Sequence, residues 1–285
     1  MAHPIVYHTI AEARAASRQA RSRGAVVGLV PTMGALHEGH ASLIRRAADE
    51  CGHVIVSIFV NPTQFDEPGD LSAYPRTLDA DLEVCAACGA AAVFCPSEAE
   101  MYPHGRPLTR VSASGLTDRL CGATRPGHFD GVATVCTKLF SACEPDRAYF
   151  GEKDYQQLLV VRRLVADLNL PVEIVPCPLI REPDGLALSS RNARLSSEER
   201  AEALVISRSL FAASALFERG ERSVAALVDA VRAALADLYL GEVDYVELLD
   251  ADDLSHIERV DRDAVLAVAV RFPSARLIDN VILRV

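Results

Sequence analysis

Two closely spaced histidines lie in a stretch of the chain whose sequence is typical of a turn. His37 and His40 are three residues apart, which places both imidazoles on one side of a first helical turn. The apolar run of residues 25–30 before them predicts a β-strand, and residues 41–50 show the apolar spacing of a helix. Backbone N–H groups and the positive end of a helix dipole favour an anion at such a turn. We therefore expect a triphosphate to bind here, although this spacing alone more often serves packing.

A second strand, turn and helix carries another polar cluster. Residues 147–150 predict a short strand, the sequence Gly-Glu-Lys-Asp at residues 151–154 predicts a turn, and residues 155–168 predict a helix. Lys153 supplies a mobile positive charge suited to phosphate, and Asp154 could accept a hydrogen bond from a ribose hydroxyl. Gln157 should face the same cleft. Taken alone, the turn could also be a solvated charged loop.

Two amide side chains follow a predicted buried strand over residues 54–60, which are β-branched and aromatic. Ligands of open α/β sheets gather at the carboxyl ends of strands, so Asn61 and Gln64 are placed to hydrogen-bond a small polar substrate. Asp81 lies in the first turn of a predicted helix over residues 79–88, where an acid ordinarily complements the helix dipole. With a nucleotide nearby, its carboxylate could instead hold Mg²⁺ against the phosphates.

A third polar group follows a change of pattern near residue 178. The sequence Glu-Pro-Asp-Gly at residues 182–185 is a turn signal between short extended runs and predicts a hairpin over residues 180–188. Ser189, Ser190 and Arg191 come next, and two hydroxyls with a guanidinium suit phosphate oxygens. A polar linker is the alternative.

These groups must be positioned by an α/β fold. Strands and helices alternate up to residue 178, which predicts a doubly wound, mainly parallel, Rossmann-like sheet. Neither the dinucleotide fingerprint nor the P-loop is present, so nucleotide binding must rest on the histidines and nearby cations. Two helices and three strands follow the hairpin, so we place the domains at 1–178 and 179–285, the second a smaller α/β domain covering the cleft.

Composition narrows the classes of partner. The formal net charge of −10 argues against a nucleic acid, and no apolar run approaches the roughly 20 residues of a membrane span. The first residues lack the apolar region of a secretory signal. The eight cysteines are expected to stay reduced. These two observations together predict a cytoplasmic protein. Cys85 and Cys88 have the spacing of a zinc pair but no matching second pair, so we expect them to pack.

Five separated motifs resemble one family in the family's own order. They are PTMGALHEGH, SIFVNPTQF, YPRT with the following Asp81, FGEKDYQQL, and SSRN after a PDG hairpin. Together they resemble the pantoate–β-alanine ligases, members of the HIGH-motif nucleotidyltransferase superfamily. The resemblance covers nearly the whole chain and implies condensation of (R)-pantoate with β-alanine to pantothenate through pantoyl adenylate, with ATP converted to AMP and pyrophosphate.

The resemblance also implies roles for individual residues. His37 and His40 would contact the triphosphate, with His40 the usual proton donor, and Lys153 with Arg191 would hold the phosphates as pyrophosphate leaves. Asp81 lies where the family binds Mg²⁺. The remaining expected nucleotide contacts are Met33, Gly34, Gly39, Gly151, Asp154, Ile180, Leu188, Ser189 and Ser190, and the expected pantoate and β-alanine contacts are Asn61, Gln64 and Gln157.

Two departures and two alternatives accompany this interpretation. Some relatives carry an acid where this chain has Ala80, which would leave Mg²⁺ one carboxylate fewer, and Leu188 replaces a common Met without an expected effect. Another HIGH-type nucleotidyltransferase and a noncatalytic ATP-binding protein are the alternatives. A homodimer is expected from the resemblance only, and no residue is assigned as the base for β-alanine.

Overall fold

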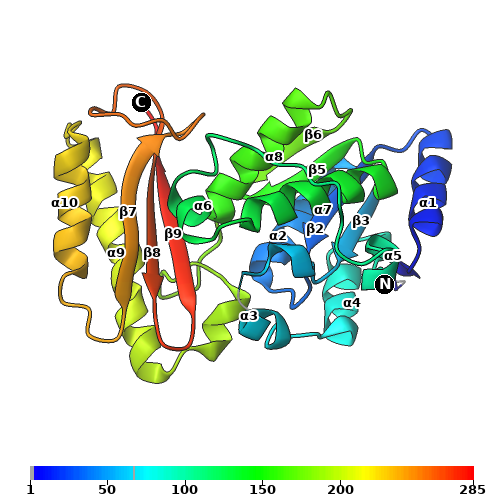
Figure 1. The fold of residues 1–285 in the computed structure, drawn as a ribbon, viewed down its shortest axis with the longest axis horizontal. Helices are drawn as coiled ribbons and strands as arrows, with labels where there is room; N and C mark the ends of the chain where they lie inside the picture. Colours follow the sequence, from blue (N-terminus) through cyan, green and yellow to red (C-terminus); the bar gives the residue numbers. More distant parts are fainter. Residues whose placement is uncertain (1–2, 67) are drawn as a thin grey trace.

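The computed structural model describes residues 3–66 and 68–285. Their strands form one six-stranded sheet and one three-stranded sheet, which lie side by side along the long axis of the molecule (Figure 1). The first sheet takes its strands from the part of the chain before residue 178, and the second from the part after residue 241. We call these regions the six-stranded part and the C-terminal part.

The six-stranded sheet is wholly parallel, with strand order β1-β4-β3-β2-β5-β6. Its strands are β1 (Ile5–Tyr7), β2 (Val27–Thr32), β3 (His53–Ile58), β4 (Ala92–Phe94), β5 (Arg147–Gly151) and β6 (Glu173–Cys177). The helices between them are α1 (Ile10–Ser22), α2 (Glu38–Glu50), α3 (Pro68–Ser72), α4 (Leu78–Ala87), α5 (Glu98–Met101), α6 (Leu120–Thr124), α7 (His128–Cys143) and α8 (Tyr155–Asp167), with the short 3₁₀ turns η1 (Pro62–Gln64) and η2 (Glu152–Asp154).

Apolar residues on both faces of this sheet explain its buried position. Leu29 and Ile55 point into a core shared with α1, α7 and α8, whereas their neighbours Val30 and Val56 point into a second core shared with α2 and α4. Successive side chains of a strand alternate between faces, so continuous apolar strands need helices on both sides. The second core also includes Cys85 and Cys88, which lie among apolar neighbours.

The order of the strands fixes where a ligand can bind. After β2 the chain proceeds through β3 and β4 toward one edge, and after β5 it proceeds to β6 at the other edge. β2 and β5 are adjacent, and their register pairs Leu29 with Ala148. The loops that leave their carboxyl ends therefore diverge, which opens a crevice at this point. The turns that carry the two histidines and Lys153 follow β2 and β5 respectively.

The C-terminal part is an antiparallel sheet with helices on one face. Its elements are η3 (Ser190–Arg194), α9 (Ser197–Glu218), α10 (Val224–Leu235), β7 (Glu242–Asp250), β8 (Ala264–Arg271) and β9 (Arg276–Leu283). A hydrophobic core of residues 186–283 joins α9 and α10 to this sheet. Leu249 and Val265 belong instead to the large core of the six-stranded part. The second face of the C-terminal sheet thus packs toward the first sheet.

The predicted fold class is confirmed: a mainly parallel doubly wound sheet precedes a smaller C-terminal α/β region. The prediction missed β1 and described residues 101–130 as irregular, although α6 lies there. The predicted hairpin closes with one bridge, between Arg181 and Ala187. The boundary at 178/179 stays a prediction.

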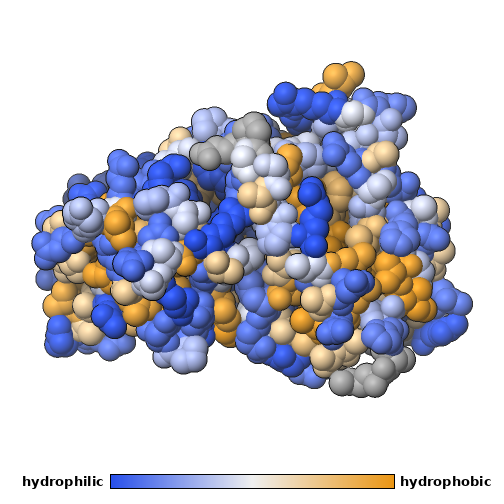
Figure 2. Space-filling view, turned by 90° about the horizontal axis from the view of Figure 1, so that it is seen from below, coloured by the Kyte–Doolittle hydropathy of each residue, from blue (hydrophilic) through white to orange (hydrophobic). Residues whose placement is uncertain are grey.

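The surface shows a difference between the two parts. On the face drawn in Figure 2, hydrophilic side chains are spread over both, and the broadest hydrophobic area lies over the six-stranded part. Among the residues that the structure describes, no helix is both long and apolar enough to cross a membrane.

Candidate active site

The turn between β2 and α2, which we call the histidine turn (residues 33–40), aims two ring nitrogens outward. Nδ1 of His37 accepts a hydrogen bond from the Gly39 amide at 3.1 Å, and Nδ1 of His40 accepts one from the His37 amide at 3.3 Å. In a neutral imidazole with an accepting Nδ1, the proton is on Nε2. Both rings, 4.1 Å apart between centroids, can thus donate from Nε2.

Burial keeps these imidazoles uncharged. Desolvation, followed by the nearby charge of Lys153, lowers the pKa of His37 to about 4. Desolvation and the neighbouring His37 lower the pKa of His40 to about 3. At neutral pH the free protein therefore presents two neutral donors here.

The Asp81 carboxylate holds the histidine turn through hydrogen bonds to its backbone. Its Oδ1 accepts the Leu36 amide at 2.7 Å and its Oδ2 accepts the Ala35 amide at 3.0 Å, with only 2% of the residue exposed. The turn needs this support because Gly34 and Ala35 both have positive φ, at 82° and 51°. A side chain at Gly34 would also approach Asp81 Oδ2 to 3.0 Å. The absence of a side chain at Gly34 therefore leaves room for the Asp81 carboxylate.

The predicted magnesium site at Asp81 does not fit this geometry. Both carboxylate oxygens are engaged by backbone amides, and Asp81 does not line the cavity beside the histidines. Ala80, its neighbour, offers no second carboxylate. Among the described residues, no cluster of three or more histidine, cysteine or acidic side chains is arranged to hold a metal ion. We therefore do not assign Asp81 as a magnesium ligand.

The lysine turn (residues 151–154) follows β5 as the sequence predicts. Lys153 Nζ lies 3.6 Å from Asp154 Oδ2, and its side chain is mostly buried. Desolvation opposes ionisation of Asp154, but the charges of Lys153 and Arg191 outweigh it and hold the pKa of this carboxyl below its ordinary value. The turn therefore presents a cation and an anion next to each other in the crevice.

The segment Ser189–Arg191 approaches from the C-terminal part. Ser189 caps η3, because its Oγ accepts the Arg191 amide at 3.2 Å. The Arg191 guanidinium contacts Asp70 at 2.8 Å, and Arg194 contacts the other oxygen of the same carboxylate at 2.9 Å. Sequence reasoning missed Asp70, which lies in a short acidic segment without a recognisable motif. It connects α3 to the cationic segment.

The predicted amide residues Asn61, Gln64 and Gln157 all border the cavity, but Asn61 uses its side chain for contacts within the protein. Asn61 is 1% exposed and uses its side chain within the protein: Oδ1 accepts from the Tyr102 hydroxyl at 2.8 Å, and Nδ2 donates to Gln64 Oε1 at 3.0 Å and to the Gly131 carbonyl at 3.2 Å. It thereby orients Gln64. Gln157 lines the cavity from the first turn of α8.

One cavity of about 230 Å³ brings these groups together. Of the predicted site residues, only Gly34 and Asp81 do not line it; those that do are Met33, His37, Gly39, His40, Asn61, Gln64, Gly151, Lys153, Asp154, Gln157, Ile180, Leu188, Ser189, Ser190 and Arg191. It shares Lys153, Asp154 and Arg191 with a wider cleft of about 570 Å³ between the two parts of the molecule. The site is therefore open toward the C-terminal sheet.

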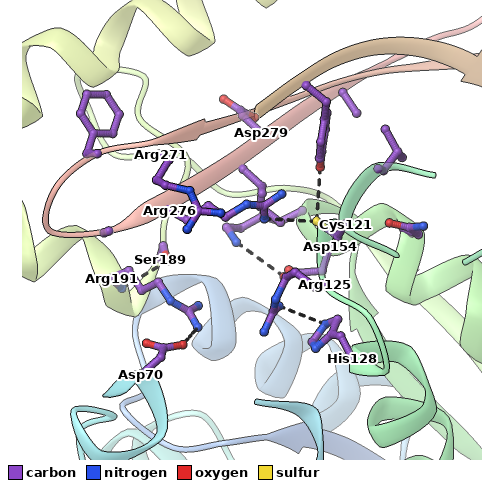
Figure 3. Close-up of a pocket in the computed structure, with 18 of the residues that line it drawn as sticks. Asp70, Cys121, Arg125, His128, Asp154, Ser189, Arg191, Arg271, Arg276 and Asp279 are labelled. Atoms are coloured by element: carbon purple, nitrogen blue, oxygen red, sulfur yellow. Dashed lines mark hydrogen bonds and ion pairs between the residues drawn. The ribbon is translucent and has the colours of Figure 1, made fainter. Parts of the chain in front are cut away.

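Figure 3 looks into the wider cleft and shows two residues that the sequence reasoning missed. Arg125 and His128 face Arg276 of β9 across it. His128 Nδ1 lies 2.8 Å from the Gln64 carbonyl, and Arg125 contacts both His128 and Asp66. Desolvation and the charge of Arg125 lower the pKa of His128 to about 4. The Arg-Pro-Gly-His sequence at residues 125–128, where α7 begins, was the available signal. Arg125 and His128 hold the loop that carries Gln64 through its carbonyl.

Comparison with known proteins agrees with this arrangement. The family model described as pantoate-beta-alanine ligase matches residues 5–282. Pantothenate synthetase from Cereibacter sphaeroides is 53% identical over 98% of this chain and 99% of that protein, and the one from Clostridium acetobutylicum is 50% identical over 96% and 98%.

Solved structures agree as well. Pantothenate synthetase from Thermus thermophilus has a TM-score of 0.91 and 45% identity, with 99% of this chain and 100% of that chain covered. The pantoate-beta-alanine ligase from Francisella tularensis, solved as a complex with beta-gamma ATP and beta-alanine, has a TM-score of 0.78 and 34% identity, covering 98% and 97%. By its motifs, its fold and these matches, the chain belongs to the pantoate–β-alanine ligase family.

Proposed function

We propose that this protein condenses (R)-pantoate with β-alanine to form pantothenate, at the expense of ATP. The observation that carries the proposal is the single cavity in which the histidine turn, the lysine turn and Ser189–Arg191 meet the amides of Gln64 and Gln157. Phosphate-binding groups and neutral hydrogen-bonding groups for a hydroxy acid thus share one space. The beta-gamma ATP and beta-alanine named in the Francisella tularensis complex support the same choice of substrates.

ATP would lie across the crevice between β2 and β5. Met33, Ile180 and Leu188 border the cavity and would frame the nucleotide, while Gly151 and Asp154 would contact the ribose. The triphosphate would then reach the histidine Nε2 groups, Lys153 and Ser189–Arg191. Neutral donors on one side and cations on the other match a chain of phosphates whose charge shifts during reaction.

In the first step a carboxylate oxygen of pantoate attacks the α-phosphorus of ATP. The bond from that phosphorus to the bridging oxygen breaks, and its electron pair leaves with pyrophosphate. The protein supplies no covalent nucleophile; it aligns the reactants and stabilises the charge that moves onto the leaving group. We assign this stabilisation to Lys153, Arg191 and the Nε2–H donors of His37 and His40. Gln64 and Gln157 would hold pantoate for the attack.

In the second step the β-alanine amine attacks the acyl carbon of pantoyl adenylate. The bond from the acyl carbon to the AMP oxygen breaks, its electron pair leaves with AMP, and the nitrogen releases one proton to solvent. Adenylation is needed because an amine cannot displace oxide from a free carboxylate, whereas AMP is a good leaving group.

Magnesium enters the proposal as the ion that accompanies ATP. Mg²⁺ is commonly bound through substrate phosphates and only one or two carboxylates. When bound it neutralises phosphate charge. Because the Asp81 oxygens are engaged, neither step of the reaction is assigned to a protein-held metal.

The proposal extends to location and assembly. All eight cysteines are free in the structure, which suits a reducing compartment, and we place the protein in the cytoplasm.

We also propose a homodimer, in keeping with the family resemblance. Exposed large apolar side chains of the six-stranded part, such as Ile5 and Leu108, offer surface for it. Light scattering coupled to gel filtration tests the dimer.

Pyrophosphate release tests the function. The protein is mixed with ATP, Mg²⁺ and pantoate, and β-alanine is added later. A pantoate-dependent burst close to one equivalent per chain, followed by continuous AMP and pantothenate formation when the amine arrives, is the expected result. Folded protein that gives neither burst nor turnover would overturn the proposal in favour of another acceptor or of ATP binding alone.

A further inference from the structure

A buried amide from the far end of the chain reaches the lysine turn. Asn280, on β9 of the C-terminal sheet, donates from Nδ2 to the main-chain carbonyls of Glu152 at 3.0 Å and Lys153 at 2.9 Å. It is 7% exposed. Both amide protons of one side chain are thus used on two successive carbonyls of η2. A single residue of β9 therefore holds two neighbouring peptide groups of the lysine turn.

The neighbouring residue on the same strand, Asp279, connects β9 to a second segment of the site. The Asn280 backbone amide donates to Asp279 Oδ1 at 2.7 Å, and the Asp279 carboxylate receives both terminal nitrogens of Arg181, at 2.7 and 2.9 Å. Asp279 is 4% exposed, so this pair is shielded from solvent. Arg181 also donates to the Gly185 carbonyl at 3.1 Å. β9 is thereby tied to the hairpin that leads into Ser189–Arg191.

The hydrogen bonds of Asn280 and Asp279 lead to the two segments that carry the cations of the cavity, Lys153 and Arg191. Through Asn280, β9 holds the turn that carries Lys153; through Asp279 and Arg181, it holds the hairpin that precedes Arg191. Figure 3 shows Asp279 on its strand above the cleft, with Asp154 and Arg191 below it. One dipeptide of the C-terminal part therefore sets the relative position of both groups.

We propose that Asn280 is a positioning residue for adenylation, acting through Lys153. Its two hydrogen bonds fix the backbone on which the lysine stands, so that the ammonium group faces the triphosphate in one orientation. This inference rests on the proposed function. It does not require Asn280 to touch a substrate. Misplacement of an aligned reacting group by about 1 Å costs on the order of 100-fold in rate, which sets the expected effect.

The test compares Asn280→Ala with a control in the same region. Val231→Ala removes buried methyl groups from α10 in the core of the C-terminal part, away from the lysine turn. Single-turnover formation of pantoyl adenylate from ATP and pantoate is expected to fall on the order of 100-fold in Asn280→Ala and less than about twofold in Val231→Ala. The KM for ATP should rise while the KM for pantoate stays within about twofold, because the lysine contacts the triphosphate and not pantoate.

Two further measurements separate positioning from loss of structure. Conversion of supplied pantoyl adenylate by β-alanine should stay within about threefold of the parent, because the lysine turn acts on the departing pyrophosphate. Asn280→Asp, nearly identical in shape, should lose at least as much as Asn280→Ala, since an oxygen would face the two carbonyls. Equal losses in both half-reactions, or equal losses in Asn280→Ala and Val231→Ala, would overturn the proposal.

A double variant tests whether Asn280 acts through Lys153. If it does, Lys153→Ala with Asn280→Ala should be no slower than Lys153→Ala alone; multiplying losses would contradict it. Should the parent protein form no pantoyl adenylate, the proposed function fails and affinity decides this inference instead. In that case a nonhydrolysable ATP analogue, measured by calorimetry, should bind about tenfold more weakly to Asn280→Ala, and unchanged binding would refute the positioning role.

Discussion

The histidine turn and the lysine turn face the same cavity but are held in different ways. The histidine turn is supported from within the six-stranded part, by its own helix and by the Asp81 carboxylate on α4. The lysine turn takes its support from β9, more than 120 residues away in sequence, through Asn280. The histidine turn offers neutral donors, and the lysine turn offers a cation beside a carboxylate.

This difference suggests a division of labour. Donors that stay neutral and are locally supported can be in place before ATP binds. The backbone of Lys153 is held by the C-terminal part. Its cation is therefore in place only when the two parts of the molecule are correctly positioned relative to each other. The contrast makes four predictions, which run from the largest expected effect to the smallest.

Removing the charge of the lysine turn should have the largest effect. Lys153→Ala is expected to slow pyrophosphate release by about 1000-fold, at the upper end of what one stabilising group contributes. Lys153→Arg should recover part of the rate, because it restores a cation of different shape. Thermal unfolding should be nearly unchanged, since the lysine occupies the cleft. A folded Lys153→Ala variant with normal turnover would exclude the charge from the reaction.

Removing a donor from the histidine turn should cost less. His40→Ala is expected to slow adenylation by about 100-fold, the effect of losing one preorganised hydrogen-bond donor. His40→Gln places an amide donor near the former Nε2 and should recover activity in part. If the imidazole acted as an acid, glutamine would rescue nothing. The ratio of the two rates therefore distinguishes a neutral donor from a proton donor.

Acid should destabilise the protein through its buried histidines. The pKa of His37 and that of His128 are lowered from 6.5 to about 4, so the unfolded state binds protons that the folded state does not. This stabilisation is complete above pH 6.5 and is lost as pH falls toward 4, by about 1.4 kcal/mol per pH unit for each histidine.

His128→Asn tests this expectation without an ionisable group at that position. Its amide can still donate to the Gln64 carbonyl, as the ring does. Denaturant unfolding between about pH 7 and pH 5 should show a slope lower by about one proton than in the parent. An unchanged slope would mean that His128 titrates normally in the folded protein.

Releasing Arg191 should have the smallest effect. Asp70 competes with phosphate for this guanidinium, and both side chains are only partly buried. Asp70→Asn is therefore expected to lower the KM for ATP about two- to threefold, within the range of an ion pair open to solvent. Arg194, which contacts the same carboxylate, provides the control: Arg194→Ala should not lower the KM. A raised KM in Asp70→Asn would show that the pair orders the site instead.

Local patterns predicted the turns because each one is coded by contiguous residues. The apolar run before His37, the turn residues and the helical spacing after it lie within one short stretch of the chain, and the same holds around Lys153. Fold class followed from the alternation of strands and helices. The short strand β1 was missed because three residues carry almost no periodic signal.

Supports that join distant segments could not be predicted in this way. Asn280 lies in an ordinary apolar strand, and nothing in its neighbourhood identifies the two carbonyls that it contacts. The position of Asp81 was predicted, but not the direction of its carboxylate, which depends on two backbone amides of another segment. Similarly, Arg125 and His128 acquire their roles only when the loop of Gln64 packs against them.

Hydrogen exchange read residue by residue tests most directly whether the two turns are supported independently. The amides of residues 34–40 and 151–157 are followed in the parent, in Asp81→Asn and in Asn280→Ala. We predict faster exchange at 34–40 alone in Asp81→Asn, and at 151–157 alone in Asn280→Ala. If either substitution accelerates exchange in both turns alike, or in neither, the account of two separately supported turns is wrong.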